Sequence, residues 1–217
     1  MAKLRVAVLI SGRGSNMAAL IEAAKDPAFP AEIVHVISNR ADAGGLETAQ
    51  KAGIATSIIE QKSFGKGEPA REAFERALSD TLKQADAGLV CLAGFMRILT
   101  AEFVGEWYGK LINIHPSLLP AFKGLDVHQR MLDAGVKIAG CTVHYVSAEM
   151  DAGPIIGQAA VPVHSGDDAQ TLAARILAQE HKLYPECVRR IAAGEVALDA
   201  LARLDIPPTD GFLRNPS

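Results

Sequence analysis

Asn113 and His115 are the residues whose types and spacing point most directly to chemistry, because they flank a single residue at the end of the segment 111–115. Alternate residues of an extended segment share a face, so the two polar side chains point the same way. A carboxamide and an imidazole on one face can polarise a carbonyl, stabilise the oxyanion of a tetrahedral intermediate and move a proton. The alternative is a capped strand end with a hydrogen-bonded histidine, and the spacing alone favours that alternative.

Asp151 is a second candidate, in the loop 147–153. An acidic loop residue is ordinarily solvated, but if this loop folds back over the sheet edge, its carboxylate can pair with His115 and favour the imidazolium. The pair Asp126 and His128 offers half of a metal site, yet no matching ligand cluster appears, so we expect no metal. The remaining histidines are expected to be core or surface residues: His35, His144, His164 and His181.

A glycine-rich turn, residues 12–16, offers backbone N–H groups, a hydroxyl and an amide at the start of an expected helix, which suits a phosphate group. The dinucleotide pattern would need a third glycine where Met17 stands, and the lysine of a P-loop is absent. The sequence therefore does not favour binding of NAD or ATP at this turn. Phosphate binding and a tight turn that merely needs glycine remain open alternatives.

The elements that must position these residues alternate between strands and helices. The longer helices are expected at 17–25, 42–52 and 68–84, a short one is expected after the cap Thr100, and a last one begins at Asp167 or Asp168 and is interrupted near Pro185. Strands are expected at 6–10, 33–38, 55–60, 89–93, 111–114, 138–146 and 155–163.

This alternation predicts an α/β fold: a single-domain, Rossmann-like open sheet, mostly parallel in its N-terminal half, with helices on both faces. Such a sheet binds ligands beyond the carboxyl ends of its strands. The segments 12–16, 94–99 and 113–120 each follow a strand end, so we expect them to converge.

Composition and charge restrict the number of domains, the partners and the location of the protein. The 217 residues are 49% hydrophobic and carry a net charge of −3, which suits one folded domain at 1–205 with an irregular tail at 206–217 and does not favour a nucleic-acid partner. Three scattered cysteines fit neither a disulfide framework nor a zinc site. The first apolar run, 6–10, is too short for a signal or membrane segment. We expect a cytoplasmic protein with no membrane partner.

Four segments taken in order closely resemble the phosphoribosylglycinamide formyltransferases, the folate-dependent formyltransferases of purine synthesis. They are Ser-Gly-Arg-Gly-Ser-Asn at 11–16, Leu-Ala-Gly-Phe-Met-Arg-Ile-Leu at 92–99, Asn-Ile-His-Pro-Ser-Leu-Leu-Pro at 113–120 and Met-Asp-Ala-Gly-Pro at 150–154. The similarity runs from about Val6 to Pro185. The third segment with the downstream Asp-x-Gly-Pro is specific to 10-formyltetrahydrofolate transferases and hydrolases.

The resemblance implies transfer of a formyl group from the co-substrate 10-formyltetrahydrofolate to the primary amine of glycinamide ribonucleotide, in de novo purine biosynthesis. Asn113, His115 and Asp151 match the family's catalytic triplet. In this mechanism the amine attacks the formyl carbon, Asn113 and protonated His115 stabilise the oxyanion of the tetrahedral intermediate, and Asp151 supports the imidazolium. Neither a covalent enzyme intermediate nor a metal is implied.

The resemblance also implies the binding residues. Gly14, Ser15 and Asn16 match the ribonucleotide phosphate site, and Gln179 and Glu180 match the residues that hold the glycinamide end. Arg71 matches an arginine that can meet the glutamate carboxylate of the folate, with a solvated helix residue as the alternative. The walls of the pterin pocket correspond to Met96, Arg97, Ile98, Leu99, Ser147, Ala148, Glu149 and Met150, together with Asn113 and Asp151. Arg13, Lys123 and Asp126 gain no role.

Three other functions fit the sequence less well. Formyltetrahydrofolate hydrolases resemble this core but carry an extra N-terminal domain, whereas this chain begins at its first strand. Methionyl-tRNA formyltransferases need a basic C-terminal domain, for which few residues follow Gly166. A noncatalytic phosphate-ligand sensor would keep the glycine-rich turn but has no use for the triplet. We expect small-molecule partners and a monomer or homodimer.

Overall fold

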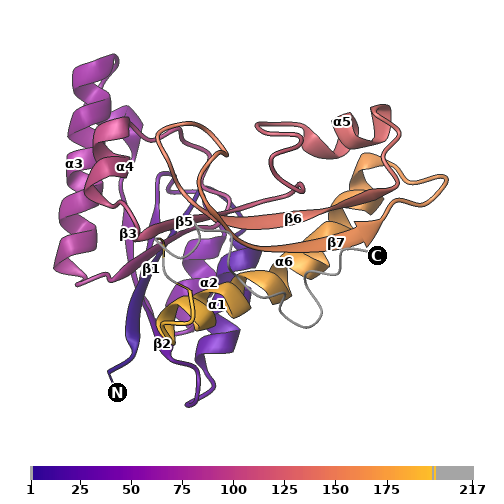
Figure 1. Cartoon of the computed structure of the whole chain (residues 1–217). Coiled ribbons are helices and arrows are strands. Elements are labelled where there is room, and N and C mark those ends of the chain that lie inside the picture. The colour runs from indigo at the N-terminus through magenta and orange to yellow at the C-terminus, as the bar shows by residue number, and fades with distance from the viewer. Residues whose placement is uncertain (1, 197, 199–217) are drawn as a thin grey trace. The chain divides into compact units, whose positions relative to one another are not determined.

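The computed structural model describes residues 2–196 and residue 198 of the chain (Figure 1). The chain forms two compact units that divide between Ile112 and Asn113. The assignment of residues 1–205 to one catalytic domain stays a prediction. The tail predicted at 206–217 lies outside the described residues.

The N-terminal unit is built on a parallel sheet whose strands are β1 (Leu4–Ile10), β2 (Ala31–Ser38), β3 (Ala55–Ile58) and β4 (Leu89–Leu92). Their order is β3-β2-β1-β4, and the three pairs are parallel. Residues 6–10 of β1 and all of β4 are buried, as their continuous apolar runs predicted.

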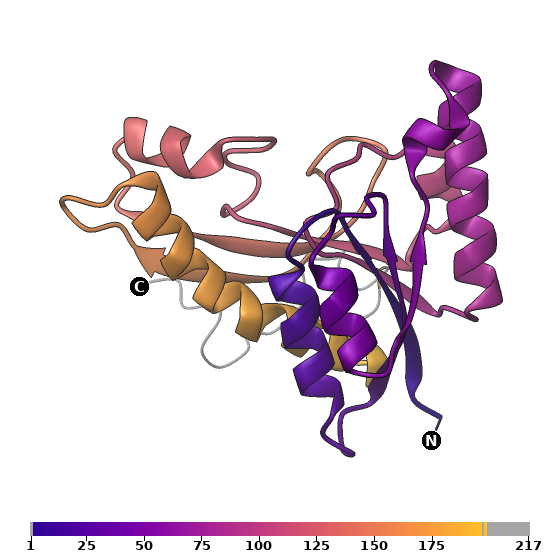
Figure 2. The same ribbon diagram turned by 180° about the vertical axis from the view of Figure 1, so that it is seen from behind.

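The helices of this unit are α1 (Ser15–Ala24), α2 (Gly45–Lys51), α3 (Glu68–Gln84) and α4 (Ala101–Glu106), with a 3-10 turn, η1 (Gln61–Phe64). Right-handed crossovers from β1 to β2 and on to β3 step in one direction, so α1 and α2 share a face. The step back from β3 to β4 places α3 on the opposite face, and Figure 2 shows the two helix layers. The predicted helices on both faces are confirmed, whereas η1 was not predicted.

The C-terminal unit begins within β5 (Leu111–His115) and continues with β6 (Ile138–Tyr145) and β7 (Ile155–Pro162). β6 and β7 form an antiparallel hairpin. The long helix α6 (Ala169–Ala192) packs on this hairpin, and α5 (Val127–Asp133) contacts α6 (Figure 1). The antiparallel hairpin was not itself predicted, but it is consistent with a sheet that is mostly parallel only in its N-terminal half.

The predicted interruption near Pro185 is wrong, because α6 runs through it without a break. Pro185 removes one backbone hydrogen bond from the helix. It lies on the buried side of α6, next to Tyr184 and Cys187, and packing of that side outweighs the lost bond. Asp168 is confirmed as the N-cap, because its side chain accepts from the Thr171 N–H. Helix α5 was not predicted.

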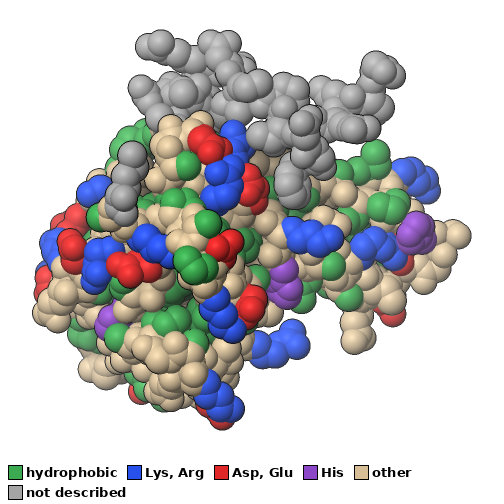
Figure 3. All heavy atoms as spheres, turned by 90° about the horizontal axis from the view of Figure 1, so that it is seen from below, with side chains coloured by type: hydrophobic (Ala, Val, Ile, Leu, Met, Phe, Trp, Pro, Cys, Tyr) green, Lys and Arg blue, Asp and Glu red, His purple; other side chains and the backbone are tan. Residues whose placement is uncertain are grey.

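All three cysteines, Cys91, Cys141 and Cys187, are buried, and none of them is in a disulfide. On the face seen in Figure 3, basic and acidic side chains are interspersed rather than gathered by sign. Among the described residues, none of the helices has the length and apolar character needed to cross a bilayer.

Candidate active site

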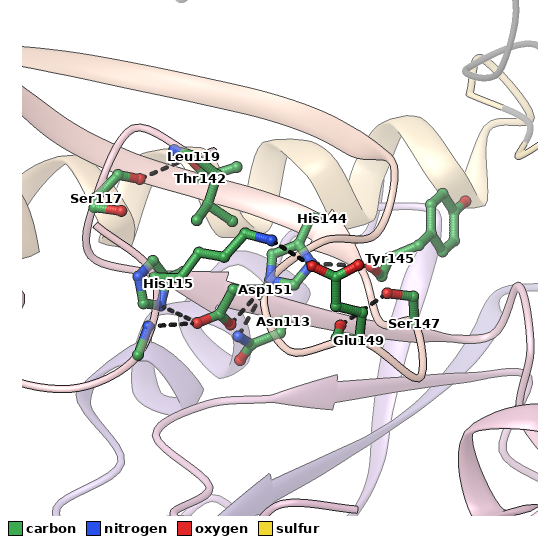
Figure 4. A network of polar contacts seen from close by, with 12 residues as sticks. Asn113, His115, Ser117, Leu119, Thr142, His144, Tyr145, Ser147, Glu149 and Asp151 are labelled. Carbon is green, nitrogen blue, oxygen red and sulfur yellow. Dashed lines mark hydrogen bonds and ion pairs between the residues drawn. The ribbon is translucent and has the colours of Figure 1, made fainter. Parts of the chain in front are cut away.

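β5 delivers Asn113 and His115 to one side of the C-terminal unit. Leu111, Ile112 and Ile114 are buried, so both faces of the strand are packed at its start. Ile112 and Ile114 share one face, and Leu111, Asn113 and His115 share the other, as strand alternation requires. Figure 4 shows Asn113 and His115 both directed toward Asp151, which confirms that the two side chains share a face.

Asp151 reaches this pair from the loop between β6 and β7. Its Oδ2 lies 3.5 Å from His115 Nδ1, and its Oδ1 lies 3.9 Å from His144 Nε2. The same carboxylate accepts a hydrogen bond from the Gly124 N–H at 2.9 Å. The loop therefore folds back as the pairing with His115 required, and one carboxylate faces two imidazole rings.

Both ring nitrogens of His115 face acceptors. Nε2 lies 2.9 Å from the carbonyl oxygen of Phe122, to which its N–H donates, and Nδ1 faces Asp151. A doubly protonated imidazole therefore has a partner for each of its N–H groups. His115 is only 6% exposed, so water competes little for these contacts. The geometry suits an imidazolium that donates a proton or stabilises a developing negative charge.

His144 is buried, as expected of a core residue, but it also contacts Asn113 and Asp151, which the sequence did not indicate. It lies on β6 with 2% of its surface exposed, and its Nδ1–H donates to the Tyr145 carbonyl oxygen at 2.9 Å. Because that bond places the proton on Nδ1, Nε2 is an acceptor in the neutral ring, and the Asn113 Nδ2–H donates to it at 3.3 Å. His144 thereby sets which way the Asn113 amide points.

The electrostatic surroundings of His144 agree with a neutral ring. Burial is the main cause that lowers its pKa, and the charge of His115 acts in the same direction. The Tyr145 carbonyl and the charge of Asp151 oppose this shift without cancelling it. The only sequence signal was a histidine among buried residues of a strand, which is ordinarily a core residue.

The loop that carries Asp151 has a second attachment. Lys123 Nζ lies 2.9 Å from Glu149 Oε1, and Ser147 Oγ donates to the Glu149 carbonyl oxygen at 2.9 Å. Lys123, for which no functional role was predicted, thereby contacts this loop. The loop residues predicted to line the pterin pocket are placed together here: Ser147, Ala148, Glu149, Met150 and Asp151.

In the N-terminal unit, the glycine-rich turn leads directly into α1. Gly14 is the N-cap and has a φ of +69°, a backbone conformation that favours glycine. No side chain caps the first turn of α1, Ser15 is exposed there, and Asn16 is buried. This arrangement leaves backbone N–H groups at the positive end of the helix, next to the exposed Ser15.

The loop after β4 meets the same turn. Ser11 Oγ accepts from the Met96 N–H at 2.8 Å, and the Ser11 N–H donates to the Gly94 carbonyl oxygen at 3.2 Å. β1 and β4 are the neighbours at which the chain reverses its direction across the sheet, and ligand sites form at such points. The predicted convergence of segments 12–16 and 94–99 is confirmed, and that of 113–120 with them stays a prediction.

Three further predicted residues lie elsewhere. Gln179 and Glu180 are on α6 in the C-terminal unit, and Glu180 is buried. Burial of Cys141, reinforced by the charge of Glu180, raises the pKa of that thiol to about 12. Arg71 is on α3, where its Nη2–H donates to the Ile98 carbonyl oxygen at 2.8 Å. It is therefore not a simply solvated residue.

Within the part of the chain that the structure describes, no group of three or more His, Cys, Asp or Glu side chains is arranged to hold a metal ion. The chemistry visible in the C-terminal unit is instead that of a carboxamide, an imidazole and a carboxylate. Such a set can stabilise an oxyanion and transfer protons without a metal.

Comparisons with known proteins identify a family and several relatives of this chain. The formyl transferase family matches residues 4–188. Phosphoribosylglycinamide formyltransferase of Escherichia coli is 43% identical over 195 residues, which cover 90% of each chain. A solved structure of the enzyme of that name from Brucella melitensis is 53% identical with a TM-score of 0.83, covering 90% of this chain and 99% of the other.

A longer relative matches as well. The trifunctional purine biosynthetic protein adenosine-3 of Bos taurus is 50% identical over 202 residues, which are 93% of this chain and 20% of the relative, so the chain spans a small part of that protein's length. The E. coli and B. melitensis proteins match over nearly their whole length. The family match covers both units described above, and with these identities it shows that the chain belongs to the formyl transferase family.

Proposed function

We propose that the protein transfers the formyl group of 10-formyltetrahydrofolate to the primary amine of glycinamide ribonucleotide, a step of de novo purine biosynthesis. The observation that carries this proposal is the cluster of Asn113, His115 and Asp151, with 3.5 Å between His115 Nδ1 and Asp151 Oδ2. It occurs in a chain that is 43% identical to phosphoribosylglycinamide formyltransferase of E. coli. The name of the trifunctional relatives supports the pathway.

In this reaction the substrate amine attacks the formyl carbon, and the carbonyl oxygen gains negative charge. The Asn113 Nδ2 atom has two hydrogens, of which one is donated to His144 and the other is available to the oxyanion. To donate to the same oxygen or to the departing folate nitrogen, protonated His115 exchanges one of its two protein acceptors, Phe122 or Asp151, for the substrate. Asp151 stabilises the imidazolium and helps to route the proton that the attacking amine loses. The bond from carbon to the folate nitrogen then breaks.

Two groups of residues are proposed for the ribonucleotide. Gly14, Ser15 and Asn16 supply the phosphate site, for which the uncapped first turn of α1 is the support. Gln179 and Glu180 hold the glycinamide end. The buried carboxylate of Glu180 is suited to accept a hydrogen bond from the amine and so orient its lone pair.

For the folate co-substrate we propose Arg71 with the loop Met96, Arg97, Ile98 and Leu99, and also Asn113 with residues 147–151. Met96 and Ile98 are 69% and 71% exposed, which suits side chains that a flat aromatic ligand covers. We propose small-molecule partners, no metal, no nucleic-acid or membrane partner, a cytoplasmic location and a monomer or homodimer.

The test follows the folate absorbance change with purified protein and 10-formyltetrahydrofolate, once with glycinamide ribonucleotide and once without it. Turnover that requires the ribonucleotide supports the proposal. Turnover without the ribonucleotide indicates a hydrolase. No turnover in either assay indicates a noncatalytic phosphate-ligand sensor. His115→Ala is expected to reduce turnover by about 10²-fold or more. His164→Ala, at an exposed histidine, is the matched control and is expected to retain full turnover.

A further inference from the structure

Helix α3 carries a polar stripe of which the proposed function uses only the first residue, Arg71. Arg71, Glu75, Ser79 and Lys83 follow one another at intervals of four residues, so they lie on one face of the helix. Each contacts the segment 98–107, which runs from the end of the loop after β4 through α4. The stripe therefore attaches this segment at several points along its length.

The first two members hold the loop itself. Arg71 Nη2–H donates to the Ile98 carbonyl oxygen at 2.8 Å. The carboxylate of Glu75 accepts from the Thr100 N–H at 2.9 Å and from the Thr100 hydroxyl. Arg71 Nε lies 3.6 Å from Glu75 Oε1, so the guanidinium and the carboxylate also face each other.

The last two members hold the helix. Ser79 Oγ accepts from the Trp107 Nε1–H at 3.1 Å, and Lys83 Nζ lies 2.5 Å from Glu106 Oε1. Trp107 is buried and is the only tryptophan of the chain. Its fluorescence therefore reports whether α4 stays docked on α3, separately from the state of the loop.

Glu75 is the unusual member of the stripe because it is a carboxylate with only 5% of its surface exposed. A buried carboxylate is costly unless donors surround it. Here Thr100 supplies two donors, and its hydroxyl oxygen accepts in turn from the Phe103 N–H at 3.2 Å, which caps α4. Glu75 thus fixes the point at which the loop ends and the helix begins.

We propose that Glu75 is a positioning residue for the folate co-substrate: by holding Thr100 and Arg71 it sets the backbone of residues 96–100 against which the folate binds. This inference rests on the proposed function. The side chains of Met96 and Ile98 are exposed, whereas the Met96 N–H and the Ile98 carbonyl oxygen are held by hydrogen bonds. The loop therefore presents exposed side chains on a backbone that is held in place.

The first arm of the test is independent of any substrate. In Glu75→Ala the Thr100 N–H loses its acceptor, so amide hydrogen exchange of residues 96–100 is expected to rise about tenfold. Glu72→Ala removes the same charge from the same helix but breaks only a contact with Arg76, and it is expected to leave this exchange unchanged. Trp107 emission is expected to stay at its wild-type wavelength in both variants.

The second arm measures kinetics. Glu75→Ala is expected to raise KM for 10-formyltetrahydrofolate about tenfold, with kcat and KM for glycinamide ribonucleotide within twofold of wild type. Glu75→Gln keeps an acceptor for the Thr100 N–H and is expected to recover most of the affinity. An equal change in both KM values, or a shifted Trp107 emission with general loss of stability, would show a merely structural role and overturn the inference.

The two proposals fail in distinguishable ways. If the wild-type protein shows no ribonucleotide-dependent turnover, the proposed function fails, and the role for folate fails with it, whatever the exchange arm shows. If wild type is active and Glu75→Ala loosens residues 96–100 without a selective rise in the folate KM, the proposed function stands and the role of Glu75 is refuted.

Discussion

At the scale of single residues, one carboxylate organises the candidate catalytic cluster. Asp151 lies 3.5 Å from His115 Nδ1 and 3.9 Å from His144 Nε2, yet the two rings are held differently. His115 has an acceptor at each nitrogen, whereas His144 donates to Tyr145 and accepts from Asn113. The first ring is suited to carry a proton, and the second is suited to remain neutral and orient an amide.

Asp151→Asn removes the charge that faces His115 while nearly preserving shape. We expect kcat to fall by about 10²-fold or more, because the carboxamide no longer stabilises the imidazolium. Steady-state assays with both substrates measure this. Asp133→Asn, at a surface residue that accepts from Gln129, is the control and is expected to behave as wild type. Turnover of Asp151→Asn within twofold of wild type would contradict the role given to Asp151.

His144→Phe fills the same space but cannot accept the Asn113 N–H. The amide is then free to rotate, and we expect kcat to fall about tenfold. His144→Gln, whose side-chain oxygen can accept that N–H, is expected to retain more of the activity than His144→Phe. If the two variants are equally active, His144 does not act through Asn113.

At the scale of elements, the positions of the strands could be predicted from the sequence, because continuous apolar runs and their spacing indicate which segments are buried. The sequence was also sufficient for the alternation that places Asn113 and His115 on one face. It could not show that the loop 147–153 returns to β5, since that depends on contacts with residues far away in the chain. Pro185 was misjudged for the same reason: local propensity argues for a break, and packing of α6 prevents it.

Gly153 determines how closely the loop 147–153 approaches β6. A Cβ at this position would lie 1.8 Å from the Tyr145 carbonyl oxygen, which is backbone and cannot move aside. We expect Gly153→Ala to displace Asp151 and to lower kcat/KM by about 10²-fold. At Gly105, on α4, a Cβ would meet nothing within 4 Å, so Gly105→Ala is the control. Wild-type kinetics in Gly153→Ala would show that the loop tolerates displacement.

At the scale of the whole molecule, burial lowers the pKa of several histidines. Desolvation lowers the pKa of four histidines: His35, His128, His144 and His181. Their unfolded forms titrate near pH 6.5. Below that pH the unfolded chain binds protons that the folded chain does not, so the free energy of unfolding decreases as pH falls through this window.

We therefore expect a lower urea midpoint at pH 5.5 than at pH 7.5. The carboxylates with lowered pKa, such as Asp42 and Glu47, lose their contribution only at more acidic pH and do not account for this difference. Urea unfolding followed by Trp107 fluorescence at both pH values measures it. An equal or higher midpoint at pH 5.5 would show that the histidines gain compensating partners in the folded state.

The three buried thiols can be used to measure local opening of the folded protein. Cys91 lies in the N-terminal unit, and Cys141 and Cys187 lie in the C-terminal unit, each almost fully shielded in the fold. A thiol reagent can modify them only when the surrounding unit opens, and the raised pKa of Cys141 further suppresses its thiolate. Labelling kinetics resolved by peptide mass would therefore show whether the two units open together or one before the other.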